Sequence, residues 1–480
     1  MSPTRAGARR YFVETWGCQM NELDSQRMAG QLMLQGLLPS RDADGADLIL
    51  LNSCSVREKA EQKVYSRLGE YRLLKRGRPG LRIGLCGCVA QQEGERALAR
   101  VPDLDFVLGP ARVGELGALL ARVDAGERPV AVGFPEERAY ELEAVSRADE
   151  YKGMVTAIEG CDKKCTFCIV PYTRGPERCR PLSAILEEVR HLLDLGFVEI
   201  ELLGQTVNHW QEPGGEADFA DLLDAVAALP GLRRLRFVTS YPRDFTSRMV
   251  ERFRLHANLC DYLHLPVQSG SDRTLRRMGR GYARADYLRL VAELRAARPS
   301  LALTTDLIVG FPGESEEEFG ETLELVERAR FAGIFAFCYS PRPGTPAVRL
   351  PDPVAPEVAS ERLQRLLEAQ KRIQSELNRE LVGREMEVLV TGWGKDGGRQ
   401  VGRTSCNRIV HFESAFDGGG DRPGTIVPVR ISRALPHSLL GERLPAEGGF
   451  ARRSGEARSR AEPGAAGPGR PASSVLPVVP

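Results

Sequence analysis

Three cysteines crowd into one short loop of this chain, in the segment EGCDKKCTFCIVPYTRG. Cys161, Cys165 and Cys168 form a CxxxCxxC spacing directly after an apolar run that is typical of a strand. Three thiolates this close together can hold one 4Fe-4S cluster, which leaves its fourth iron without a protein ligand. An open iron can bind the amino and carboxylate groups of S-adenosylmethionine (SAM). An electron from the cluster can then cleave the sulfonium and release a 5′-deoxyadenosyl radical.

Two alternatives to a radical cluster must be weighed for this loop. A structural zinc site usually needs four protein ligands in two pairs, and the loop lacks the second pair. Cys179, in the segment PERCRP, could supply a fourth ligand and close the cluster. We expect Cys179 to have no metal partner, so that the fourth iron stays open.

A second group of three cysteines is scattered over the first hundred residues. Cys18 in TWGCQMN, Cys54 in LNSCSVRE and Cys88 in LCGCVAQ each follow a predicted strand. The carboxyl ends of parallel strands share one edge of a sheet, so the three thiols can meet there and hold a second 4Fe-4S cluster. Inert buried cysteines are the alternative. Cys86 competes with Cys88, and we favour Cys88 because it lies further beyond the strand, after the flexible Gly87.

The elements that must position these cysteines form two α/β units. Strand-like runs alternate with helical segments over residues 9–135, which predicts an N-terminal parallel α/β domain. A charged, poorly patterned linker is expected over 136–150. About six strand and helix pairs then follow over 151–382, and they fit a partial (β/α)6 barrel. Its active site would gather at the carboxyl ends of the strands.

The sequence changes character after residue 382. Short β-prone segments, separated by Gly-rich turns such as GKDGG and DGGGD, predict a small antiparallel β-barrel over 383–445. Residues 446–480 are rich in Gly, Pro, Ala, Ser and Arg, and we expect them to be disordered.

Basic residues gather in the predicted β-barrel and could contact phosphates. They are Arg384, Lys395, Arg399, Arg403, Arg408, Arg430 and Arg433. Solvated surface charge is the ordinary explanation for any one of them. Trp393 can stack on an RNA base or fill the barrel core, and we expect Phe412 in the core.

Polar residues follow several of the predicted barrel strands, at the end where a bound molecule would meet them. They are Gln205, Asn208, Ser240, Gln268, Ser269 and Asp306. Such groups can bind SAM or orient a substrate. Each can equally cap a strand or hold a loop, and Asp306 can equally be buried in an ion pair. We therefore assign no catalytic base.

Composition and charge indicate a globular protein that does not cross a membrane. The 480 residues include 66 Lys and Arg against 65 Asp and Glu, so nucleic acid would have to be bound by a local basic patch. No apolar run approaches the roughly 20 residues that cross a bilayer, and the start MSPTRAGARR lacks the apolar stretch of a signal peptide. We expect a cytoplasmic protein without a membrane partner. In that reducing compartment, cysteines favour metal ligation over disulfides.

Dense motifs give the chain a family resemblance from about Tyr11 to Glu442. They include ETWGCQMNELDS, LNSCSVREKAEQKVYSRLGE, GCDKKCTFCIVPYTRGPE, LHLPVQSGSD, TTDLIVGFPGE and FCYSPRPGTPA. The chain resembles the methylthiotransferases, and its closing segment, from VGREMEVLV to PHSLLGE, resembles their RNA-binding TRAM domain. Cys179 departs from the pattern, because relatives usually carry serine there.

The resemblance implies roles for both cysteine groups. Cys161, Cys165 and Cys168 would hold the radical cluster, and the other three would hold an auxiliary cluster that carries the sulfur to be inserted. One SAM would methylate that sulfur and a second would supply the radical. The implied substrate is N6-isopentenyladenosine next to the anticodon of tRNA, methylthiolated at C2. An electron donor and a sulfur source, which the sequence does not identify, are implied as further partners.

Related activities form the alternatives to this reading. Methylthiotransferases that modify an aspartate of a ribosomal protein or threonylcarbamoyl-adenosine would share both clusters. Their first motif reads more like GCPKN or GCKVN, whereas GCQMN and CSVREKA stand here. A different class, a plain RNA-binding or electron-transfer iron-sulfur protein, would form no 5′-deoxyadenosine.

Overall fold

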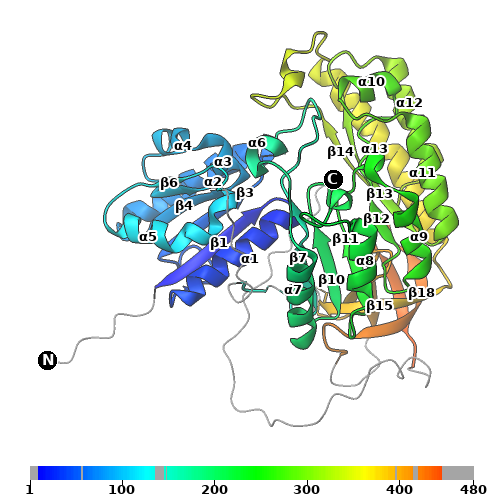
Figure 1. Cartoon of the computed structure of the whole chain (residues 1–480), viewed down its shortest axis with the longest axis horizontal. Helices are drawn as coiled ribbons and strands as arrows, with labels where there is room; N and C mark the ends of the chain where they lie inside the picture. The colour runs from blue at the N-terminus through cyan, green and yellow to red at the C-terminus, as the bar shows by residue number, and fades with distance from the viewer. Residues whose placement is uncertain are drawn as a thin grey trace.

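The computed structural model describes residues 9–55, 58–135, 145–147, 149–394, 397–413 and 420–445. Most of the predicted linker over 136–150, all of 446–480 and Lys395 lie outside the described residues. Three folding units follow one another along the chain and lie side by side in Figure 1. Within the described part, no helix is both long enough and apolar enough to cross a membrane.

The N-terminal unit is a parallel sheet with helices on both faces. Its strand order is β2-β1-β3-β4-β5-β6, and every pairing is parallel. The strands are β1 (Arg10–Trp16), β2 (Leu38–Pro39), β3 (Leu48–Ser53), β4 (Arg82–Gly87), β5 (Phe106–Leu108) and β6 (Val130–Ala131). The helices are α1 (Gln19–Leu34), α2 (Glu58–Gly77), α3 (Cys88–Glu93), α4 (Glu95–Arg100) and α5 (Leu116–Asp124). Burial of every residue of β3 explains its run of apolar residues, because a doubly covered parallel strand has no solvent face.

The central unit is the predicted six-stranded partial barrel. The strands are β7 (Lys152–Thr156), β10 (Glu199–Leu203), β11 (Arg234–Phe237), β12 (Tyr262–His264), β13 (Ala302–Val309) and β14 (Gly333–Cys338). They form two parallel sheets, β11-β10-β7 and β12-β13-β14. An isolated parallel bridge between Leu235 and Leu259 links the two sheets. A short hairpin, β8 (Ile158–Glu159) with β9 (Arg178–Cys179), follows the first strand.

Helices cover the outside of this barrel (Figure 1). They are α7 (Leu182–Asp194), α8 (Phe219–Ala227), α9 (Ser247–Leu255), α11 (Arg284–Ala297), α12 (Glu316–Ala329) and α13 (Pro356–Arg379). The short helix α6 (Val170–Arg174) packs instead against α3 of the N-terminal unit, and α10 (Asp272–Arg277) lies in the segment after β12. Alternate strand residues such as Ile200 and Leu202 pack outward in the main apolar core. Their neighbours Glu199 and Glu201 therefore point to the inner face of the barrel.

Helix α1 of the N-terminal unit packs against the inner face of the barrel. Its Met20 and Leu23 share an apolar cluster with Met154 of β7, Leu203 of β10 and Val238 after β11. The last two lie at the carboxyl ends of their strands, which form the mouth of the barrel. The N-terminal unit therefore sits at the mouth.

The C-terminal unit is a closed five-stranded barrel in the order β15-β16-β17-β19-β18. Its strands are β15 (Glu385–Trp393), β16 (Gln400–Thr404), β17 (Ile409–Glu413), β18 (Ile426–Ala434) and β19 (Leu439–Arg443). Four pairings are antiparallel, as expected, but β17 and β19 pair in parallel. This parallel pair closes the barrel.

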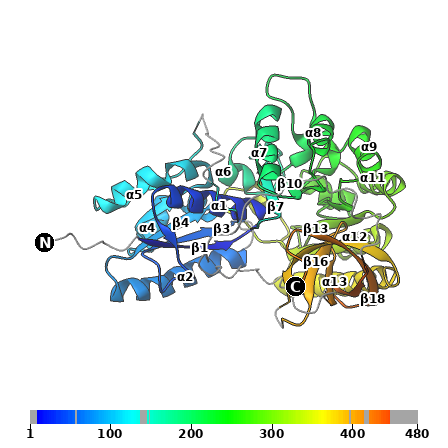
Figure 2. The ribbon, with the colours of Figure 1, turned by 90° about the horizontal axis from the view of Figure 1, so that it is seen from below.

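The small barrel docks at the end of the central barrel that is opposite the mouth. Arg234, at the start of β11, donates to the carbonyl oxygens of Glu387 (2.9 Å) and Arg403 (2.8 Å). Arg236 donates to those of Thr404 and Ser405, both at 2.9 Å. Figure 1 shows β15 and β18 below β10 and β11, and Figure 2 shows the same barrel from below.

Candidate functional site

The three N-terminal cysteines meet at one edge of the parallel sheet. Cys18 immediately precedes α1, Cys54 follows β3, and Cys88 is the first residue of α3 after β4. Their strands β1, β3 and β4 are neighbours, so the carboxyl ends bring the thiols together, as the sequence predicted. Cys86 lies within β4 and is buried in an apolar cluster on one face of the sheet. Burial raises the pKa of the Cys86 thiol.

Hydrogen bonds among these thiols change their acidity. The Cys54 thiol is hydrogen-bonded to Cys18 and Cys88 and lowers the pKa of each to about 6, while its own pKa is raised. The nearby guanidinium of Arg174 also lowers the pKa of Cys18 and Cys88. Thiolates are the form that binds metals, so the site favours metal ligation.

The second cysteine group lies in the loop between β8 and α6. Cys161 is buried, and Cys165 and Cys168 are half-buried. The backbone turns tightly before the loop, because Gly160 has a φ of +75° and the N–H of Cys161 donates to the carbonyl of Gly175 at 3.1 Å. Burial raises the pKa of Cys168 to about 12 and also raises that of Cys161.

The two cysteine groups fit clusters better than single ions. No set of three or more His, Cys, Asp or Glu side chains among the described residues is arranged to hold one metal ion. The ligands of a 4Fe-4S cluster bind different irons, so they stand further apart than ligands of one ion. Each donor set offers three thiols, with no fourth protein ligand among the residues that the structure describes, and so fits a cluster with one open iron. Cys179 does not join them, and its sulfur accepts the backbone N–H of Gln211 at 3.4 Å.

Three family models match the chain in the order of its three units. They are the uncharacterized protein family UPF0004 over residues 10–109, the radical SAM superfamily over 155–326 and the TRAM domain over 379–444. A tRNA-2-methylthio-N(6)-dimethylallyladenosine synthase of Koribacter versatilis is 42% identical over 92% of this chain and 99% of its own length. The synthase of the same name from Anaeromyxobacter dehalogenans is 48% identical over 91% of this chain and 94% of its own length.

The chain belongs to this synthase family. Membership of the radical SAM superfamily implies a 4Fe-4S cluster and SAM as cofactors. A solved structure supports the fold: the radical SAM methyltransferase TsrM from Kitasatospora setae, with tryptophan and a SAM analogue bound, aligns with a TM-score of 0.50. The alignment covers 80% of this chain and 78% of that chain at 14% identity.

The six polar residues predicted at the barrel mouth fall into three pairs in this member of the synthase family. Gln205 Oε1 and Ser240 Oγ are buried without a hydrogen-bond partner among the described residues. By contrast, Asn208 exchanges hydrogen bonds with the backbone of Tyr241 at 2.7 and 3.0 Å, and so holds two strand ends together. Ser269 Oγ is hydrogen-bonded to Thr322 at 3.3 Å and has the same kind of structural role.

The other two predicted residues, Gln268 and Asp306, lie next to each other on adjoining segments. The backbone N–H of Gln268 donates to the carbonyl of Asp306 at 2.9 Å. The Asp306 carboxylate faces the barrel interior, 3.4 Å from His264 Nε2. His264 Nδ1 is 3.0 Å from the hydroxyl of Thr304.

An exposed aromatic ring beside this pair was missed by the sequence analysis. Phe335 of β14 stands opposite Asp306 in the strand register, and its side chain is 40% exposed. Its ring meets that of His264 edge-on, with centroids 5.7 Å apart. The strand alternation could have indicated an inward position, but nothing in the sequence shows that the ring stays uncovered.

The C-terminal barrel matches the TRAM domain model. Its predicted basic residues differ in exposure. Arg408 is half-buried and donates to the carbonyl of Ala332 at 2.9 Å, so it joins the two barrels. The arginines on the exposed surface are Arg384, Arg399, Arg403, Arg430 and Arg433. Phe412 is fully buried in the barrel core, as expected, whereas Trp393 is 53% exposed.

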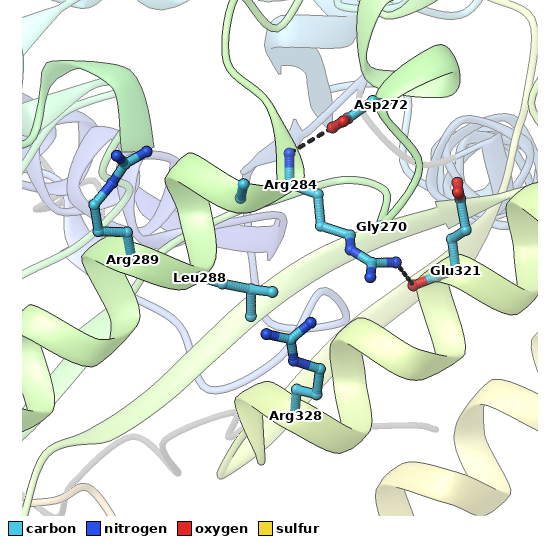
Figure 3. A pocket seen from close by; sticks show the side chains of 8 residues that line it. Gly270, Asp272, Arg284, Leu288, Arg289, Glu321 and Arg328 are labelled. Carbon is cyan, nitrogen blue, oxygen red and sulfur yellow. Dashed lines mark hydrogen bonds between the residues drawn. The ribbon is translucent and has the colours of Figure 1, made fainter.

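A pocket of about 570 Å³ lies away from the cysteines, on the helical exterior of the central barrel. Arg284 and Arg289 of α11 and Arg328 of α12 line it (Figure 3). Two of them contact one carboxylate, because Arg284 lies 3.0 Å and Arg328 3.4 Å from Glu324. These arginines have partners and none belongs to the mouth of the barrel, so the pocket is not the candidate active site.

Proposed function

We propose that this protein catalyses SAM-dependent methylthiolation of tRNA, at C2 of the adenine in N6-isopentenyladenosine next to the anticodon. One observation carries the proposal: two separate groups of three cysteines meet where the N-terminal unit adjoins the barrel mouth, in a chain of the synthase family. Isopentenyl and dimethylallyl name the same substituent here. A tRNA-modifying enzyme of this kind acts in the cytoplasm and needs an electron donor and a sulfur source.

The two cysteine groups would have different functions. Cys161, Cys165 and Cys168 would hold a 4Fe-4S cluster whose open iron binds SAM, which supplies a 5′-deoxyadenosyl radical. The N-terminal cysteines would hold an auxiliary 4Fe-4S cluster that supplies the sulfur. Gln205 Oε1 and Ser240 Oγ, buried and without partners in the described chain, would hydrogen-bond SAM or the substrate base.

The inner face of the barrel offers a place for the target base. Phe335 presents an uncovered ring, and the Asp306 carboxylate and His264 imidazole stand beside it. A splayed adenine can stack on such a ring while its edge meets polar groups. We therefore assign Phe335 to stacking and His264 and Asp306 to orientation of the base.

Iron counting on two triple variants tests this function. Reconstituted protein should hold about eight irons per chain, and about four after Cys161, Cys165 and Cys168 are replaced by Ala. That variant should form no 5′-deoxyadenosine. Replacement of Cys18, Cys54 and Cys88 by Ala should also leave about four irons and preserve SAM cleavage, but stop methylthiolation of isopentenylated tRNA.

Cys179→Ser is the matched control, because Cys179 follows the loop but bonds the Gln211 backbone instead of the thiols. It should keep about eight irons and both activities. Unchanged iron in either triple variant, or methylthiolated tRNA from the N-terminal triple variant, would contradict the assignment.

A further inference from the structure

One arginine connects the two cysteine groups. Arg174 ends α6, the helix that follows Cys168, yet its Nε donates to Cys88 Sγ in the N-terminal unit at 3.2 Å. Its Nη1 lies 2.7 Å from the carboxylate of Asp24, and both side chains are almost fully buried. Helix α6 packs against α3, which begins at Cys88 (Figure 1).

One hydrogen-bond donor of the Arg174 guanidinium is unused among the described residues. Arg174 Nη2 is buried and has no hydrogen-bond partner among the described residues. A buried charged group with an unused donor is costly unless an acceptor completes its bonding. Nη2 belongs to the same planar group whose Nε already bonds Cys88, so an acceptor at the N-terminal cysteines is the partner that the geometry offers.

Arg280 is a second buried arginine beside a cysteine, and each of its guanidinium nitrogens has a hydrogen-bond partner. Its Nη1 donates to Cys165 Sγ of the other cysteine group at 3.3 Å. Its Nη2 donates to the carbonyl of Pro266 at 2.8 Å, and its Nε to the hydroxyl of Tyr282 at 2.9 Å. Every nitrogen of Arg280 therefore has a protein partner, whereas one nitrogen of Arg174 has none within the described part of the chain. The contrast shows that the guanidinium at the N-terminal cysteines still has a donor for an anionic group bound there.

We propose that Arg174 is a positioning residue that holds an anionic iron-sulfur cluster at Cys18, Cys54 and Cys88 and raises its reduction potential. The inference rests on the proposed function, because it assumes that this site holds the auxiliary cluster. Cluster potentials depend on net charge and on hydrogen bonds to the sulfurs. A fixed cation that donates hydrogen bonds stabilises the reduced state, which carries one more negative charge.

Redox titration of the full chain tests this role without relying on turnover. The background is the variant in which Cys161, Cys165 and Cys168 are Ala, so only the N-terminal cluster contributes to the electron paramagnetic resonance signal. Arg174→Gln, which removes the charge, should make the midpoint potential more negative. Arg174→Lys keeps a charge but loses the planar donors, so its shift should have the same sign and be smaller.

Arg280→Gln in the same background is the matched control, because it removes another buried arginine, one that lies beside the position of the replaced Cys165. Its midpoint potential should equal that of the background. An unchanged potential in Arg174→Gln, or an equal shift in Arg280→Gln, overturns the role of Arg174. Loss of iron from Arg174→Gln but not from Arg174→Lys supports the role of Arg174. In that case the positive charge at this position is what retains the cluster. A background without any iron overturns the auxiliary cluster itself and the proposed function with it.

Discussion

Phe335 is an unusual residue for a strand of a folded barrel, because its ring stays uncovered beside two polar groups. The neighbours Ile334 and Ala336 pack against the main apolar core on the outer face of β14. Exposure of an aromatic ring on the inner face costs stability unless a ligand covers it. Stacking of a base on the ring would provide that cover.

Phe335→Ala should weaken binding of isopentenylated RNA. It should not affect the cleavage of SAM when no RNA is present. Base stacking on an aromatic side chain contributes about 1–3 kcal/mol, which corresponds to a rise in KM of roughly 5- to 150-fold. Phe335→Tyr keeps the ring and should retain most of the affinity. Steady-state kinetics with an anticodon stem-loop would measure both variants. Equal KM values for the wild type and Phe335→Ala would remove the stacking role.

At the residue scale, the sequence predicted what depends on local spacing and missed what depends on distant contacts. Cys161, Cys165 and Cys168 are neighbours in the chain, and Cys18 lies next to a strand end that the apolar pattern reveals. Arg174 contacts a cysteine 86 positions earlier, and no periodicity connects them. Whether a cluster binds at either group is still a prediction, which the iron count tests.

At the scale of elements, a buried ion-pair network fastens α7 to the hairpin and to the segment before β7. Glu188 of α7 lies 2.6 Å from Arg180 Nη1 and 2.7 Å from Arg147 Nη2. All three side chains are at most 12% exposed. Loss of one partner leaves the others buried and unpaired, which costs about 3–5 kcal/mol.

Glu188→Gln should therefore lower the thermal midpoint of unfolding at neutral pH. Burial by itself raises the pKa of Glu188, but the two arginines outweigh it and hold this pKa below its usual value. The ionised carboxylate thus stabilises the fold above pH ~4.3, and this contribution is lost as pH falls through the lower folded pKa. The midpoints of the wild type and the variant should converge in acid. A constant difference from pH 7 to pH 3 in calorimetry would contradict this account.

Element by element, the apolar patterns predict most of the longer strands to within about two residues, but β15 and β18 extend three residues beyond the ends that these patterns predict. The run EIELL predicts a strand at 199–203, and β10 has these bounds. The long polar segment from Pro356 predicts a helix, and α13 begins there. The missed strands β2, β5 and β6 have two or three residues each, too few to show a period. The missed β19 has five residues, LLGER, and its pairing in parallel with β17 depends on barrel closure and not on a local turn.

At the scale of the whole molecule, the small barrel and the candidate active site at the mouth lie at opposite ends of the central barrel. The eight residues of β13 span about 26 Å. RNA that contacts the exposed arginines of the small barrel must therefore span at least this distance to place one nucleotide at the mouth.

Charge removal on the small barrel should weaken RNA binding and flatten its salt dependence. The test variant replaces the exposed Arg384, Arg399, Arg403 and Arg433 with Gln. Each lost phosphate contact should reduce the slope of log K against log salt by about 0.7–0.9. Binding of full-length tRNA across a salt series would measure this.

The control removes the same charge from the outer helices of the central barrel. It replaces Arg254, Arg289, Arg328 and Arg372, which are 56–63% exposed, with Gln. Its salt slope should match the wild type. Equal loss in both variants would mean that total charge, and not the small barrel, governs binding. An unchanged slope in the test variant would leave the small barrel without a role in binding RNA.

The docking contacts of Arg234 and Arg236 also bear on how the protein is made. The residues whose carbonyls these two guanidiniums bind, Glu387 and Arg403 to Ser405, follow the central barrel in the chain, so they leave the ribosome after it. Until then both cations at the base of the barrel have Glu199 as their shared carboxylate partner, and the nascent unit lacks its final cover. Completion of the fold thus depends on completion of translation. A chain that ends before residue 385 lacks these carbonyl acceptors, so we expect its central barrel to be less stable than that of the full chain.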